Sequence, residues 1–119
     1  MPRPSLLRPL FWLLCAVVAL LSLVPTEVLP PSAFAWSDKA QHALGFAALG
    51  AVGLLAYPAR RLGLFVGLLA FGGAIELAQA TTTWRHAEWA DWLADGVGLG
   101  AAWAISAAAD FRRRIANRC

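Results

Sequence analysis

Between Trp84 and Trp103, charged residues lead directly into an otherwise apolar helical segment. Asp91 and Asp95 lie in a stretch that is otherwise apolar enough to enter a membrane. An acidic side chain at the middle of a bilayer costs roughly 2.5 to 3.5 kcal/mol on insertion scales, so it normally faces protein or a water-filled cavity. Asp91, Asp95 and Gly98 recur at helical spacing and share one face of the predicted helix. We therefore expect that face to point into the protein.

The composition also indicates an integral membrane protein. Of the 119 residues, 60% are hydrophobic and 14% are charged, whereas soluble domains have about 25% charged residues. A chain of this length forms one domain, so we expect a single membrane domain over residues 1–119. The net charge of +3 does not predict a nucleic-acid partner, because its meaning depends on the side of the membrane that each charge occupies. We expect no cofactor.

Four apolar segments approach the ~20 residues that a helix needs to cross ~30 Å of hydrocarbon. They are residues 6–24, 39–57, 62–80 and 89–109. The first segment also resembles a cleavable signal peptide, with Ala33 and Ala35 as candidate small residues. These residues lie far beyond the apolar core, which favours a retained helix. The expected fold is an all-α bundle of four transmembrane helices.

Charge asymmetry predicts the orientation of this bundle. Four spans place both termini on the same side, and the arginines gather on that side: Arg3, Arg8, Arg60, Arg61, Arg112, Arg113, Arg114 and Arg118. The opposite side has only Lys39 and Arg85. Positive residues favour the cytoplasmic side. We therefore expect cytoplasmic termini, with loops 25–38 and 81–88 outside.

This topology brings polar residues from three segments to the outer end. They are Asp38, Lys39, His42, Glu76, Gln79, Arg85, Asp91 and Asp95. Glu76 and Asp95 lie about 6–9 Å below their predicted helix ends, so contact between them is expected. Glu76 is near a helix C-terminus, where negative charge is disfavoured. We therefore expect Glu76 to be protonated or paired with Lys39 or Arg85, and Asp95 is a candidate partner for His42.

Several chemical interpretations of this cluster remain open. His42 and Glu76, with Asp91 or Asp95, offer nitrogen and oxygen ligands to a metal, but their spacing matches no known zinc signature. No zinc helix, phosphate loop or nucleophile elbow is present, so no catalytic residue is assigned. The charges could also simply stabilise the bundle. Other polar and aromatic residues are expected in solvated loops or at the membrane interface: His86, Glu88, Trp36, Trp84, Trp89 and Trp92.

The ordered motifs resemble those of the VanZ-like family of small membrane proteins. They are Asp38-Lys39-x-x-His42, Glu76-x-x-Gln79, Arg85, Asp91 and Asp95-x-x-Gly98, within residues 36–103. Two positions depart from the family pattern. Ile75 replaces a frequent Asp, and Asp95 stands where Asn is frequent.

The resemblance implies a multi-pass protein of the bacterial inner membrane, with a link to low-level resistance to teicoplanin. We expect an outward-facing polar pocket that binds a lipidic or amphiphilic cell-wall component or a glycopeptide-type drug. Lys39 and Arg85 would hold an anionic group, and the acids would hold amine or hydroxyl groups. The alternatives are an intramembrane enzyme on a lipid carrier and a small proton- or solute-coupled transporter acting as a homo-oligomer.

Overall fold

The computed structural model describes residues 3–34 and 37–119, and this part of the chain is all-helical. Its four α-helices are α1 (Pro4–Leu23), α2 (Asp38–Ala56), α3 (Arg61–Ala80) and α4 (Trp89–Ala116). Two short 3-10 turns, Thr26–Val28 and Pro31–Phe34, lie between α1 and α2. The candidate cleavage residue Ala35 and the candidate interfacial residue Trp36 lie outside the described residues.

Local sequence signals explain both ends of α2. Ser37 caps α2, since its side-chain oxygen accepts a hydrogen bond from the backbone N–H of Ala40 at 3.1 Å, which satisfies an otherwise free donor. Pro58 follows the end of α2, where a proline disfavours further helix. The helix α4 continues to Ala116, beyond the expected span end at residue 109. Residues 110–116 contain no glycine or proline that would end it.

Three of the described helices are long and apolar enough to cross a membrane: Ser5–Leu23 in α1, Arg61–Ala80 in α3 and Trp89–Ala116 in α4. The helix α2 has a similar length, but Asp38, Lys39 and His42 near its start lower its mean hydropathy. Large apolar side chains are exposed on the outer surface, among them Leu62, Leu77, Val97 and Ile105. Such a surface is typical of contact with lipid rather than with water. The chain therefore has the character of a membrane protein.

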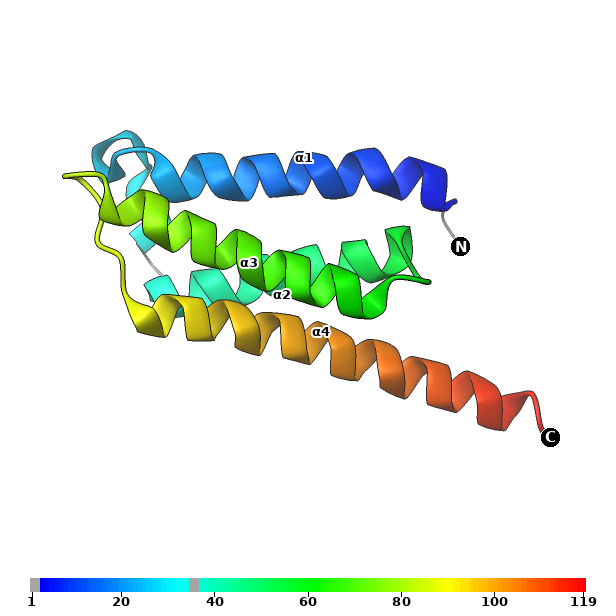
Figure 1. Cartoon of the computed structure of the whole chain (residues 1–119). Coiled ribbons are helices and arrows are strands. Elements are labelled where there is room, and N and C mark those ends of the chain that lie inside the picture. Colours follow the sequence, from blue (N-terminus) through cyan, green and yellow to red (C-terminus); the bar gives the residue numbers. More distant parts are fainter. Residues whose placement is uncertain (1–2, 35–36) are drawn as a thin grey trace.

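The four helices lie side by side, and α2 and α4 form the most extensive contact (Figure 1). Gly98 of α4 lies directly against the backbone of Ala43 in α2. Phe46 and Leu49 of α2 and Leu99 of α4 are almost fully buried in the core. Both termini lie at one end of the bundle, and the α1–α2 and α3–α4 connections lie at the other end (Figure 1). This second end holds the polar residues.

Candidate functional site

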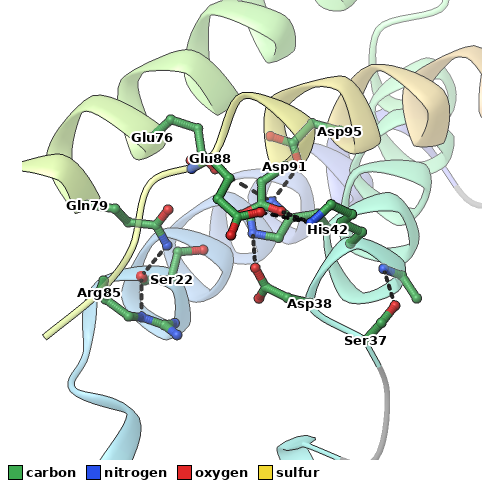
Figure 2. A network of polar contacts seen from close by, with 12 residues as sticks. Ser22, Ser37, Asp38, His42, Glu76, Gln79, Arg85, Glu88, Asp91 and Asp95 are labelled. Carbon is green, nitrogen blue, oxygen red and sulfur yellow. Dashed lines mark hydrogen bonds and ion pairs between the residues drawn. The ribbon is translucent and has the colours of Figure 1, made fainter.

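His42 lies at the centre of a buried polar cluster, between side chains of three helices (Figure 2). Its Nδ1 is 2.7 Å from Oδ1 of Asp95 in α4 and 3.9 Å from Oε1 of Glu76 in α3. Its Nε2 is 3.9 Å from Oδ2 of Asp38, one turn earlier in α2. The expected pairing of His42 with Asp95 is confirmed. Each of the two ring nitrogens of His42 thus lies near at least one carboxylate.

Lys39 connects the start of α2 to the start of α4. Its Nζ is 2.9 Å from Oε2 of Glu88 and 3.6 Å from Oδ1 of Asp91. Asp91 is buried, whereas the side chains of Lys39 and Glu88 are about half exposed. Glu88 is an exposed loop residue, as the sequence predicts, and in the structure it also binds this lysine. Its backbone N–H also donates to Oε2 of Glu76 at 3.2 Å.

Several buried oxygens in this region accept no hydrogen bond from the described residues. They are Oε1 of Glu76, Oε1 of Gln79, Oδ1 of Asp91 and Oδ2 of Asp95. Asp91 Oδ1 still has the Lys39 ammonium at 3.6 Å. A buried polar atom without a partner is costly, and a buried charge is more so. These oxygens are therefore positions where a proton, a water molecule, a cation or a ligand donor stabilises the protein.

Arg85 makes its hydrogen bonds to the end of α1 rather than to the acids. Its Nε donates to the backbone oxygen of Ser22 at 2.9 Å, and its Nη2 donates to that of Leu21 at 2.6 Å. Gln79 Nε2 donates to the same Ser22 oxygen at 2.8 Å (Figure 2). The last carbonyls of a helix lack intrahelical partners and attract cations. Arg85 therefore joins the α3–α4 loop to α1. The contacts of Glu76 are with His42 and Glu88 rather than with Lys39 or Arg85, so of its two expected states only protonation stays a prediction.

Two open cavities border the cluster. The larger one, a groove of about 640 Å³ between α3 and α4, is lined by small and apolar residues together with Glu76 and Glu88. Trp89 and Trp92, whose ring centroids are 5.8 Å apart, form part of its wall. We call this cavity the α3–α4 groove. A smaller cavity of about 180 Å³ between α1 and α2 is bordered by Asp38, His42 and Arg85.

The structure brings the predicted polar residues to one end of the bundle, in two groups. The first group consists of His42 and the residues around it, namely Asp38, Lys39, Glu76, Asp91 and Asp95. In the second group, Gln79 and Arg85 bind the end of α1. Two sets within the first group place three ligand atoms within 4.8 Å of one another: Asp38, His42 and Asp91, and His42, Glu76 and Asp95.

Sequence reasoning missed the roles of Glu88, Trp89 and Trp92. The sequence shows that these residues lie at or near the start of a predicted helix. It does not show that Glu88 pairs with Lys39 or that the two tryptophans line a groove with α3.

Comparison with known proteins does not identify the chain. No protein-family model, curated protein or solved structure matches it. The functional argument therefore depends on the site.

Proposed function

We propose that the chain is a four-span membrane protein of the bacterial cell envelope that binds an amphiphilic ligand in the α3–α4 groove. The observation that carries this proposal is the composition of the groove, whose apolar wall ends at two carboxylates, Glu76 and Glu88. Ligand sites are typically apolar with a few polar groups that orient the ligand. An apolar chain would lie along Leu77 and the tryptophans, and the head group would lie at the acids.

The charges at the site favour a head group that donates hydrogen bonds. Glu76 and Glu88 are both acids, and the nearby cations are already engaged, since Lys39 binds Glu88 and Arg85 binds α1 carbonyls. Amine or hydroxyl groups of a lipid, a lipid-linked cell-wall component or a drug fit this arrangement. The anionic head group expected for Lys39 and Arg85 receives less support from these contacts.

The same proposal includes membership of the VanZ-like family and a role in teicoplanin resistance. Both rest on the ordered motifs within residues 36–103. The proposal includes a retained first helix, because α1 packs on α2 and accepts hydrogen bonds from Gln79 and Arg85. The polar cluster then lies at the outer membrane surface.

The test uses three probes with one apolar chain and different head groups: dodecylamine, dodecanol and laurate. Native mass spectrometry of the purified protein in mild detergent measures their binding. We expect the amine and the alcohol to bind more tightly than laurate. Glu76→Gln should weaken amine binding about tenfold, the equivalent of one charge-assisted hydrogen bond worth about 1.5 kcal/mol.

A groove-filling variant and a matched control complete the test. Ala74→Trp places a large side chain in the α3–α4 groove and should abolish binding of all three probes. Ala104→Trp adds the same side chain to an exposed position of α4 outside the groove and should leave binding unchanged. Equal binding of laurate and dodecylamine, or full binding by Ala74→Trp, would contradict the proposal.

A further inference from the structure

Glu76 lines the α3–α4 groove and also belongs to a second group of side chains, which includes His42 and Asp95. Glu76 Oε1 and Asp95 Oδ1 approach the same atom, His42 Nδ1, at 3.9 and 2.7 Å. We propose that His42, Glu76 and Asp95 form a binding site for one first-row divalent transition-metal ion, such as Zn²⁺. This inference goes beyond the proposed function and does not depend on it, because it requires no ligand in the groove.

The distances between the three side chains are compatible with coordination. Their ligand atoms lie within 4.8 Å of one another. Bonds of about 2.0–2.2 Å at tetrahedral angles place nitrogen and oxygen ligands of zinc about 3.4 Å apart. An ion would replace the proton between His42 and Asp95, so these two side chains would separate slightly while Glu76 moves closer. Three protein ligands would leave one position for water or another ligand.

The burial of Asp95 supplies an independent reason to expect a cation here. Asp95 is 0% exposed and Glu76 is 9% exposed, and Asp95 Oδ2 and Glu76 Oε1 accept no hydrogen bond from the described residues. Asp95 Oδ2 also lies where a Cβ on Gly72 would come within 2.7 Å, so that the glycine leaves room for the carboxylate. A neutral His42 with two carboxylates carries two negative charges, which a divalent ion balances.

The other set of candidate ligands around His42 is a poorer site. In the set of Asp38, His42 and Asp91, the Lys39 ammonium already lies 3.6 Å from Asp91 Oδ1. The side chain of Asp38 is also largely exposed. The Lys39 ammonium thus already balances the negative charge of Asp91, and it would repel a metal ion bound there. The imidazole nitrogen in the Glu76 set favours Zn²⁺ over Mn²⁺, Mg²⁺ or Ca²⁺, which prefer oxygen ligands.

The surroundings of the ligands resemble the outer shell of known metal sites. Glu76 Oε2 accepts a hydrogen bond from the backbone N–H of Glu88 at 3.2 Å, which orients the carboxylate. Asp38 lies 3.9 Å from His42 Nε2, on the side where the free ring N–H of a metal-bound histidine usually finds a carboxylate. Glu88 thus orients the Glu76 ligand, and Asp38 is placed to orient the His42 ligand.

The experiment measures metal binding by the full chain, purified without a histidine tag and treated with a chelator. Zn²⁺ affinity is measured by competition with a chromophoric chelator, and stoichiometry by elemental analysis. Co²⁺ provides a visible absorption spectrum that reports a low-symmetry site. We expect one ion per chain, and a loss of affinity of more than about tenfold in His42→Ala and Glu76→Gln, since even outer-shell changes at metal sites cost about 10–100-fold.

The second histidine of the chain gives a matched control. His86 is exposed in the α3–α4 loop, so His86→Ala should bind Zn²⁺ like the unmodified protein. Circular dichroism and thermal unfolding show whether each variant is folded, and Glu76→Gln retains an oxygen that can accept the Glu88 N–H bond. Ala74→Trp should still bind the ion, which separates this inference from the groove proposal. Absence of stoichiometric binding, or equal binding by folded Glu76→Gln, would overturn the inference.

Discussion

At the scale of single residues, Arg85 shows how one side chain can tie a loop to a helix end. Its two hydrogen bonds reach the carbonyls of Leu21 and Ser22, which the geometry of α1 leaves without intrahelical partners. Trp84 Nε1 donates to the next carbonyl, that of Leu23, at 2.9 Å. Neighbouring side chains in one loop therefore close the end of α1.

We predict that Arg85→Ala destabilises the protein by about 1–2 kcal/mol, because it removes two partly solvated hydrogen bonds from a charged donor. Arg85→Lys should retain part of this stability, since an ammonium keeps the charge but cannot bind two carbonyls in the same geometry. Reversible unfolding in detergent measures the free energy, and hydrogen exchange at residues 20–23 locates the loosened segment. His86→Ala is the control. Equal stability of Arg85→Ala and His86→Ala would show that these bonds contribute nothing measurable.

At the scale of helices, the close contact of α2 and α4 determines the position of the polar cluster. A Cβ on Gly98 would lie 2.0 Å from the backbone oxygen of Ala43, so the two helices can approach this closely because residue 98 has no side chain. Small residues at such contacts are typical of membrane helices. The same approach brings His42, one residue before Ala43, to Asp95, which is one turn before Gly98.

We predict that Gly98→Ala destabilises the protein by about 1–3 kcal/mol, because the added methyl group forces the two helix backbones apart. Gly100→Ala is a matched control in the same helix, since no neighbouring atom lies within 4 Å of the place that its Cβ would occupy. It should leave stability unchanged or raise it by up to about 1 kcal/mol through helix propensity. Unfolding in detergent compares the two variants. A loss of stability in Gly100→Ala as large as in Gly98→Ala would contradict the close-contact argument.

At the scale of the whole molecule, charge is distributed unequally between the two ends of the bundle. The end with both termini carries most arginines, and Arg61 forms an ion pair with Asp110 there. The other end carries the buried acids and Lys39. This distribution supports the proposed cytoplasmic location of the termini.

We predict that a membrane-impermeant thiol reagent labels the two ends of the bundle from opposite sides of the membrane. Cys119 is exposed and should react only after the membrane is permeabilised. Thr83→Cys in a Cys119→Ser background is exposed in the α3–α4 loop and should react in intact spheroplasts. The Cys119→Ser protein is the control, because its remaining cysteine, Cys15, is buried. Labelling of both positions from the same side would exclude four spans with cytoplasmic termini.

The sequence alone was sufficient to predict four helices, their approximate ends and the polar character of one end of the bundle. Hydropathy, helical spacing and capping are local properties, so Ser37 marks the start of α2 whatever the tertiary structure is. The helix α4 continues to Ala116, beyond the predicted span end at residue 109, because hydropathy reports the apolar span and not the helix itself.

Only the tertiary structure decided which polar residues meet. His42 and Asp95 are separated by 53 positions, Lys39 and Glu88 by 49, and Arg85 and the Ser22 carbonyl by 63. Spacing along one helix defines the face on which a residue lies, but the neighbour of that face depends on how the helices are ordered and rotated. The α3–α4 groove has the same origin, because its lining residues come from two separately predictable helices and the loop between them.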